Sequence, residues 1–402
     1  MVATVPVAFV GGYFLATTGA AIALLGLTFA TLQNAKLSSA LGAVLATRAV
    51  ASFAALAGAG WLVARSDPKR ALMVIQVLYA LTLSMLAFYL LIDGSLAGVL
   101  FVAMVFLGIL DGFFIPVNSA FIRGLAEGDG LTRINALVAT SASTSKVSGA
   151  AVGGILLAVI APASLLLVSV GAHLVHLIAI GATRVEQIEP SGDEKRGATH
   201  SRTKGALVEL RQNPWIVAIA AQATLINVVA WSPYVVIGPQ LSSTLYDGPP
   251  AWAALSAAYG VGAVAAGVGL TWKPPRSFVR AIVVAFPLWC LPLFSLAAQL
   301  PLGVSLVGAV AAGAGTSLFN VAWASVLQQR VARSNLTQVV SWVSVGPQVV
   351  APLGLLVAGT FQTPTTQAAA LGIGASIAAA GALTLGLLPM VRRIVRREVF
   401  RS

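Results

Sequence analysis

Long apolar segments separated by short polar ones run along almost the whole chain. About twelve of them contain the ~20 mostly apolar residues that a helix needs to cross a membrane. The runs do not alternate between apolar and polar positions, which favours helices over the strands of a membrane barrel. The sequence therefore predicts an all-α membrane protein of about 12 transmembrane helices, at 5–32, 37–63, 71–92, 95–117, 134–160, 163–184, 214–237, 251–272, 279–298, 302–325, 337–358 and 367–389.

Charged residues are too rare for a soluble protein. Of 402 residues, 58% are hydrophobic and 9% are charged, whereas soluble domains carry roughly 25% charged residues. Lipid must therefore cover most of the surface. The net charge is +12, but the basic residues are scattered singly between apolar runs, which argues against nucleic acid as a partner. The single cysteine, Cys290, cannot form an internal disulfide.

The cationic residues sort onto alternate loops. Between the predicted spans, one set of loops and the C-terminal tail carry almost all of them, while the other set carries Lys36 alone. Cytoplasmic loops hold the excess of Lys and Arg, so we expect both termini in the cytoplasm and an even number of spans. The N-terminus enters the first span without basic residues, so we expect no cleavable signal. The predicted location is a cell membrane, of the bacterial plasma-membrane type.

The longest polar stretch separates two sets of six spans. We predict an N-terminal six-helix bundle at 1–184, a cytoplasmic linker at 185–213, a C-terminal six-helix bundle at 214–390 and a basic tail at 391–402. Apolar residues alternate with arginines in the tail, which predicts a helix lying on anionic lipid.

The two halves carry similar short segments. Leu131-Thr132-Arg133-Ile134 precedes the fifth span as Leu336-Thr337-Gln338-Val339 precedes the eleventh, and Gly154–Ala158 is similar to Gly354–Ala358. A parallel six-span repeat is typical of transporters whose halves, related by a pseudo-twofold axis, rock against each other.

Two motifs carry a resemblance to a known family. The segment after the second span, Gly60-Trp61-Leu62-Val63-Ala64-Arg65-Ser66-Asp67-Pro68-Lys69-Arg70, has the glycine, leucine, spacing and basic end of a family loop, with Ala64 in place of its aspartate. This loop resembles that of the major facilitator superfamily, and an aspartate at position 67 looks like the branch of siderophore and multidrug exporters in that family. Gly149-Ala150-Ala151-Val152-Gly153-Gly154 resembles the antiporter motif of the fifth span without its proline. Glu209–Pro214 also looks like that branch at the start of span seven.

This resemblance implies a function and a set of partners. It implies a monomeric secondary transporter that exports a small amphipathic molecule, such as a drug, siderophore or secondary metabolite, by alternating access and proton antiport. It implies no cofactor. An uptake permease or a uniporter of the same fold is the alternative. A membrane enzyme is disfavoured, because the sequence has no nucleotide-binding loop, metal cluster or nucleophile–base pair.

Three charged residues lie inside predicted spans: Arg48, Asp111 and Lys146. A charge at a span centre costs about 2.5–3.5 kcal/mol, so we expect these side chains to face the bundle interior and to pair. They can form a polar patch that meets substrate or couples protons, or Asp111 and Lys146 can form a structural ion pair. The two cations would keep Asp111 ionised, which makes it a poor proton carrier.

Further candidates have both a functional and a packing interpretation. Possible substrate contacts are Gln222, Asn227, Trp231, Asn320 and Trp323; the alternatives are helix packing or, for Trp231 and Tyr234, an interfacial aromatic belt. His173 and His176 share one helix face, which favours packing or lipid exposure over a proton relay or a metal site. Gly149, Gly153 and Gly154 either set the direction of transport or let two helices approach closely. The loop residues Gly60, Arg65, Asp67, Lys69 and Arg70 are predicted to anchor the cytoplasmic side and are candidates for a gate latch.

Overall fold

The computed structural model describes residues 7–34, 36–92, 94–125, 128–183, 207–246 and 248–399. Within these ranges all regular secondary structure is helical. Some side chains inside the described helices remain outside the description, among them those of Trp61, Ala64 and Lys146. The chain divides into two compact units, Met1–Glu189 with Asp247–Ala257, and Pro190–Tyr246 with Ala258–Ser402.

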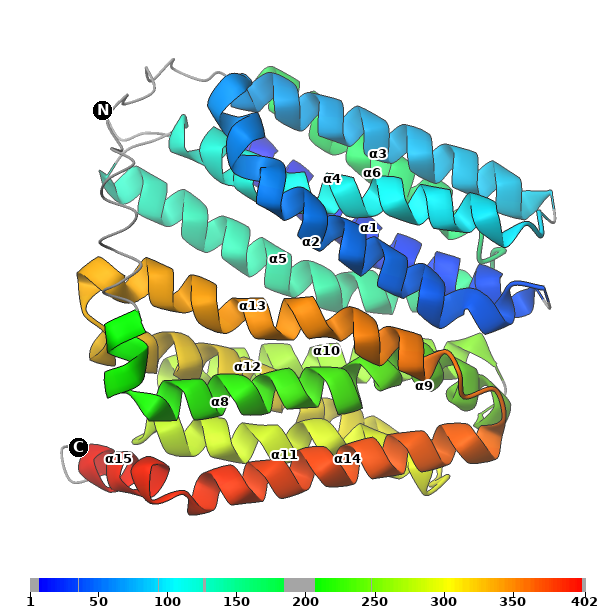
Figure 1. Ribbon diagram of the computed structural model, residues 1–402. Coiled ribbons are helices and arrows are strands. Elements are labelled where there is room, and N and C mark those ends of the chain that lie inside the picture. Colours follow the sequence, from blue (N-terminus) through cyan, green and yellow to red (C-terminus); the bar gives the residue numbers. More distant parts are fainter. Residues whose placement is uncertain are drawn as a thin grey trace. The chain divides into compact units, whose positions relative to one another are not determined.

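Each predicted span corresponds to a helix (Figure 1). In the first part of the chain the helices are α1 (Val7–Gln33), α2 (Leu41–Arg65), α3 (Pro68–Leu91), α4 (Ala97–Arg123), α5 (Gly128–Leu157) and α6 (Ser164–Ala182), with a short 3-10 turn at Ser38–Ala40. In the second part they are α8 (Pro214–Ile226), the π turn η2 (Asn227–Trp231), α9 (Ser232–Leu245), α10 (Pro249–Trp272), α11 (Phe278–Ala297), α12 (Leu302–Arg330), α13 (Arg333–Ala358), α14 (Pro364–Leu387) and α15 (Pro389–Val399).

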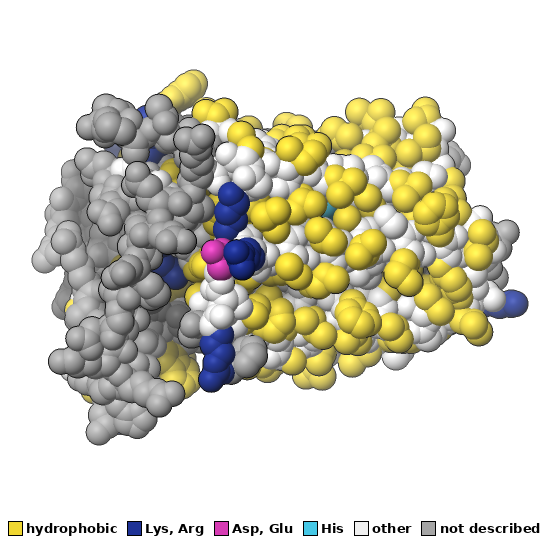
Figure 2. Space-filling model, turned by 90° about the horizontal axis from the view of Figure 1, so that it is seen from above, with side chains coloured by type: hydrophobic (Ala, Val, Ile, Leu, Met, Phe, Trp, Pro, Cys, Tyr) yellow, Lys and Arg dark blue, Asp and Glu magenta, His cyan; other side chains and the backbone are white. Residues whose placement is uncertain are grey.

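Among the described residues, eleven helical stretches are long and apolar enough to cross a membrane, with α8, η2 and α9 forming one of them. Among the described residues of the twelfth helix, α5, the apolar stretch is shorter, at Ser148–Leu157, and the segment before it carries Arg133, Lys146 and five serines and threonines at 140–145. The chain is thus an all-α multi-pass membrane protein, as the sequence predicts. In Figure 2, hydrophobic side chains cover most of the described part of one face, and the charged side chains visible there gather in a narrow strip and at one end.

The seventh span differs from its prediction in shape and length. It extends to Leu245 and contains the π turn η2 just before Pro233. Proline has no N–H to bond the carbonyl four residues earlier, which is that of Val229. A π turn widens the backbone at such a point and often marks a functional region.

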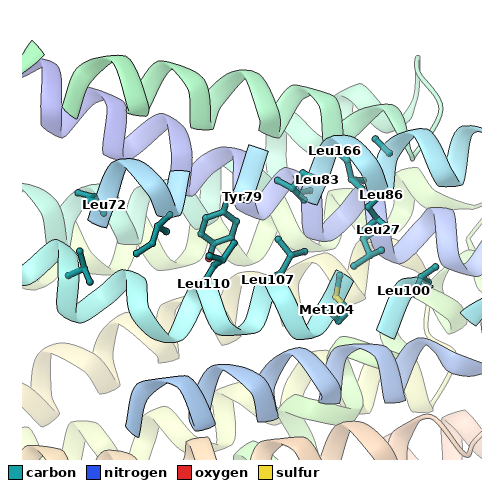
Figure 3. Close-up of a cluster of buried hydrophobic side chains, with 14 of the residues drawn as sticks. Leu27, Leu72, Tyr79, Leu83, Leu86, Leu100, Met104, Leu107, Leu110 and Leu166 are labelled. Carbon is teal, nitrogen blue, oxygen red and sulfur yellow. The ribbon is translucent and has the colours of Figure 1, made fainter. Parts of the chain in front are cut away.

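Helix pairs in the first unit pack closely. There α1 lies against α5 and α6, α2 against α4, and α3 against α4 and α6. The core between α3 and α4 consists of interleaved leucines together with Met104 and Tyr79, shown in Figure 3.

The same order of partners recurs in the second unit. The α8–α9 helix lies against α13 and α14, as α1 does against α5 and α6, and α11 lies against α12 and α14. Helix α10 bonds to α12 through Tyr259 and Thr316, whose hydroxyl oxygens are 2.7 Å apart, and through Ser317, which donates to the carbonyl of Ala263. Two units with the same internal packing are what a parallel six-helix repeat produces.

Candidate functional site: a charged and aromatic cluster in the first unit

An ion pair joins α2 to α4. Arg48 Nε donates to Asp111 Oδ2 over 2.7 Å, and Arg48 Nη2 donates to Asp111 Oδ1 over 3.2 Å. Two parallel bonds from one guanidinium fix the carboxylate in orientation as well as in position. The side chains are 21% and 32% exposed, so the pair is open enough to meet a small molecule.

Two glycines bring these helices together. Gly108 and Gly112 flank Asp111 on α4, and a Cβ at either position would overlap a backbone oxygen of α2, that of Arg48 or Ser52. Small residues that let two backbones approach closely are typical of helix contacts in membranes. The close contact places Arg48 within reach of Asp111.

The sequence left two arrangements open for Asp111, a polar patch with Arg48 and Lys146 or a structural ion pair with Lys146. The structure pairs Asp111 with Arg48, because α2 is the helix that packs against α4. Lys146 lies on α5, and its side chain is outside the described part, so its pairing stays a prediction.

Tyr79 of α3 is a third member of this cluster. It is 5% exposed, and its hydroxyl donates to Asp111 Oδ1. Figure 3 shows its ring lying between α3 and α4, beside Leu107 and Leu110. The carboxylate of Asp111 therefore accepts from a guanidinium on one helix and a phenol on another.

The cluster continues from Tyr79 into α6. The Tyr79 ring stacks on the imidazole of His173, with centroids 4.7 Å apart and planes 7° apart. His173 Nδ1 lies 2.7 Å from Gln76 Oε1. Because that oxygen only accepts, Nδ1 carries the proton in this arrangement. Residues of α2, α4, α3 and α6 thus form one continuous chain of polar and aromatic contacts.

His176 lies one turn further along α6, among aromatic rings. It is fully buried, and its ring centroid is 5.7 Å from that of Phe9, 6.0 Å from that of Tyr13 and 6.4 Å from that of Phe114. Of the alternatives left by the sequence, burial favours packing over lipid exposure for both histidines, and the proton-relay alternative stays a prediction. Lipid exposure is wrong, because α6 turns this face toward α1 and α3. Gly12 of α1 makes room there, and a Cβ on it would lie 3.1 Å from the Cα of His176.

Several buried polar atoms in this region have no hydrogen-bond partner among the described residues. They are His173 Nε2, both ring nitrogens of His176, Gln76 Nε2 and Ser169 Oγ. An unpaired buried polar group costs about 1–3 kcal/mol. Apolar side chains of similar size would be more stable here, so stability alone does not explain these residues.

In the second unit, three candidate residues lie at or next to the π turn η2. Trp231 ends the turn, is half-buried, and has its ring centroid 5.8 Å from that of Tyr234 and 5.5 Å from that of Tyr259. Tyr234 is only 5% exposed, so its assignment to an interfacial belt is wrong. Asn227 begins the turn and is half-buried.

The remaining candidates of this unit lie on α8 and α12. Gln222 is 6% exposed and its amide donates to the carbonyl of Ala378 over 2.8 Å, so it fastens α8 to α14. Trp323 is half-buried and stacks on Phe319 with centroids 6.1 Å apart, while Asn320 is exposed.

The loop between α2 and α3 is held inside the first unit. Asp67 caps α3 by accepting from the backbone N–H of Arg70 over 3.0 Å, and Pro68 follows at the first helical position. Lys69 Nζ donates to the carbonyls of Gly181 and Thr183 over 2.9 and 2.8 Å. A cation bound to the last carbonyls of a helix also complements the helix dipole. The latch role of this loop, with Gly60 and Arg65, stays a prediction.

Glycines of α5 contact α1. A Cβ at Gly149 would lie 2.5 Å from that of Ala21, and one at Gly153 would lie 3.1 Å from the Leu25 side chain. Next to them, Thr18 Oγ1 and Ser148 Oγ are 3.3 Å apart. Gly154 points to a different side of α5. The packing interpretation therefore holds for Gly149 and Gly153, whatever their part in direction.

Sequence reasoning missed Tyr79 and Gln76. The only signal was a glutamine and a tyrosine three positions apart within the apolar third span, which places both on one helix face. The described residues contain no group of three or more His, Cys, Asp or Glu side chains that could hold a metal ion.

Comparison with known proteins gives one family and one fold. The sequence profile of the Major Facilitator Superfamily matches residues 8–355. No curated protein matches the sequence. The crystal structure of the nucleoside transporter NupG is similar over 96% of this chain and 98% of that one, with a TM-score of 0.72 and 12% identity.

Two further solved structures are similar to the same extent. A bacterial homologue of the human lysosomal transporter Spinster, inward-facing and unoccupied, matches over 99% of this chain and 97% of its own, with a TM-score of 0.71 and 13% identity. A D-xylose–proton symporter matches over 96% and 97%, with a TM-score of 0.71 and 14% identity. At these identities the likeness shows the fold alone.

Proposed function

Because the chain belongs to the Major Facilitator Superfamily, and is therefore a secondary transporter that works by alternating access rather than an enzyme, we propose that it exports a small amphipathic molecule in exchange for protons. A drug, a siderophore or a secondary metabolite is the kind of substrate meant. The observation that carries the proposed direction is the contact of Gly149 and Gly153 with α1, at positions that resemble the antiporter motif. The exporter-like Asp67 supports the same direction.

The proposed substrate chemistry is supported by the exposed parts of both units. In the first unit the partly exposed Arg48–Asp111 pair offers a cation and an anion to a polar or ionic group. In the second unit the half-buried rings of Trp231 and Trp323 offer aromatic surface to an apolar body. Asn227 and Asn320 can add hydrogen bonds there, whereas the buried Gln222 is reserved for helix packing.

Proton coupling is proposed to use the cluster that begins at Asp111. Its carboxylate already accepts from Arg48 and Tyr79, so we propose that Asp111 serves as the counterion of Arg48 and that the exchanged proton binds to another member of the cluster. His173 stacks on the Tyr79 ring and is the nearest titratable side chain of the cluster; its Nε2 has no hydrogen-bond partner among the described residues and is the atom proposed to exchange a proton. A change of charge within this cluster can shift the equilibrium between the two states of the alternating-access cycle.

An uptake permease or a uniporter is the second candidate. The fold is shared with a protein named as a D-xylose–proton symporter, so the fold is compatible with either direction.

Transport by membrane vesicles separates these possibilities. Everted vesicles containing the protein should accumulate an amphipathic fluorescent dye when energised, and should lose it when a protonophore is added. One proton that crosses a membrane potential of ~100 mV releases about 2.3 kcal/mol, which can support roughly fiftyfold accumulation of the substrate. Accumulation in right-side-out vesicles would make the protein an importer, and equilibration without accumulation would make it a uniporter. Vesicles without the protein are the control.

A further inference from the structure

The C-terminal helix α15 is amphipathic and docks on the second unit. Its Val391 is 1% exposed, and the helix contacts α8, α11 and α14 (Figure 1). Arg392 and Arg393 follow Val391 and are exposed. These two consecutive arginines line two different clefts, one on each side of α15.

The first cleft lies between α11, α14 and α15. It has a volume of about 320 Å³ and is lined by Arg280, Val283, Gly386, Val391, Arg392 and Val395. Two exposed guanidinium groups thus stand over a lining that is otherwise apolar. None of these lining residues is acidic, so nothing in the lining neutralises the two cations.

The second cleft, of about 310 Å³, has a different chemistry. Arg330 and Arg393 line it together with Gln212, Asn213 and Trp215. Asn213 Nδ2 donates to Glu209 Oε1 over 3.1 Å, which places a carboxylate next to this cleft. The second cleft is therefore more polar and less suited to an anion than the first.

The position of the first cleft indicates what can occupy it. Arg280 lies in the first turn of α11, and Arg392 lies just beyond the last turn of α14. Both arginines are therefore at the ends of membrane-crossing helices, the level at which lipid headgroups lie. Apolar surface continues from the cleft along these helices, where Leu387, Leu383 and Val284 are 61%, 66% and 49% exposed.

From this arrangement we propose that the cleft between α11, α14 and α15 binds an anionic phospholipid. Its phosphate is held by the guanidinium groups of Arg280 and Arg392, and one acyl chain lies against Val283 and Gly386 and then along Leu387. Guanidinium groups bind phosphate oxygens in a two-pronged geometry. The bound lipid joins α15 to the ends of α11 and α14. The proposal is independent of the direction and the substrate of transport.

The test uses the full-length protein in nanodiscs of phosphatidylcholine with and without phosphatidylglycerol. After exchange into detergent, native mass spectrometry should show at least one retained phosphatidylglycerol per wild-type chain. The double variant Arg280→Gln/Arg392→Gln should bind it roughly thirtyfold more weakly, since each basic residue near a membrane surface contributes about 1 kcal/mol to binding anionic lipid. Arg280→Lys/Arg392→Lys keeps the charge and should retain most of the binding.

A matched control removes one charge from the same helix. Arg393→Gln takes an arginine from the second cleft, and should change phosphatidylglycerol binding less than threefold. Equal unfolding temperatures of all variants in pure phosphatidylcholine would show that they fold alike. Equal retention by the double variant and the wild type would overturn the proposal. So would equal retention of phosphatidylcholine by the wild type, or full competition by millimolar inorganic phosphate, which would assign the site to a free anion.

Discussion

The phenol of Tyr79 contacts two ionisable groups at once: its hydroxyl donates to Asp111 and its ring stacks on His173, with ring centroids 4.7 Å apart. Asp111 also receives two hydrogen bonds from Arg48. Tyr79 is therefore the residue through which a change at the partly exposed ion pair reaches the buried histidine. The contributions of the Tyr79 hydroxyl and of the Arg48–Asp111 pair can therefore be tested by separate substitutions.

Tyr79→Phe should lower transport while leaving the protein folded. The variant keeps the stacked ring and removes only the hydrogen bond to Asp111. A hydrogen bond to a charged group contributes about 1.5–3 kcal/mol, so we expect the transport rate to fall about tenfold or more. Rates are measured in vesicles at matched protein levels. Tyr89→Phe, which removes a hydroxyl near the other end of α3, is the control, and equal rates for both variants would exclude a role for the Tyr79 hydroxyl.

Gly112→Ala should destabilise the first unit. The new Cβ would overlap the backbone oxygen of Ser52, so α2 and α4 must move apart, and overpacking of this kind costs about 1–3 kcal/mol. Gly98→Ala is the matched control on the same helix, because a Cβ there meets nothing within 4 Å. Thermal unfolding in detergent should show a lower midpoint for Gly112→Ala only. An unchanged midpoint would mean that the helices are less tightly packed than the structure has them.

Lys69→Met should loosen the end of α6 rather than the whole unit. The substitution removes the donor to the carbonyls of Gly181 and Thr183 and keeps most of the apolar stem. A cation at a helix C-terminus contributes about 0.3–1 kcal/mol, so hydrogen exchange in the last turn of α6 should become faster by up to about fivefold. Arg70→Met changes the neighbouring exposed cation and should leave this exchange unaltered. If the two variants behave alike, the contact of Lys69 has no capping role.

The orientation predicted from loop charge is directly testable. A reporter fused after Lys195 should be cytoplasmic, and one fused after Asp247 should be external, because basic loops stay inside. A third fusion after Ser402 should again be cytoplasmic. The opposite pattern would reverse the protein in the membrane and would place the proposed lipid site on the outer leaflet.

Most of the fold was predictable from the sequence, because a membrane span is a local property. About 20 apolar residues suffice to define one, and the helices correspond to the predicted spans within a few residues at most ends. The π turn was missed, since it depends on how Pro233 and the preceding carbonyls are accommodated. For α5, the described residues contain only the shorter apolar stretch Ser148–Leu157, which follows the serines and threonines at 140–145.

The candidate site was harder to predict, because it depends on which helices touch. Arg48 and Asp111 are 63 positions apart, and their pairing follows from the contact of α2 with α4 at Gly108 and Gly112. From the sequence alone, Lys146 was as good a candidate partner of Asp111 as Arg48. The histidines were assigned to one face correctly, but the residues facing them, Gln76 and Tyr79, come from a third helix that no local pattern connects to α6.

The last prediction separates the structural and the transport roles of the ion pair. Asp111→Asn leaves the guanidinium of Arg48 without its counterion. Breaking a fully buried pair costs about 3–5 kcal/mol, and because these side chains are 21% and 32% exposed we expect a smaller loss, of about 2 kcal/mol. Arg48→Gln alone leaves the opposite charge unpaired and should be destabilising in the same way. The double variant Arg48→Gln/Asp111→Asn is neutral at both positions and should recover most of the stability, as a coupled pair does in a double-mutant cycle. If the pair also serves transport, the double variant will unfold near the wild-type temperature and still fail to accumulate substrate in energised vesicles. Recovery of both stability and transport would make the pair purely structural, and additive losses in the cycle would show that the two side chains do not interact.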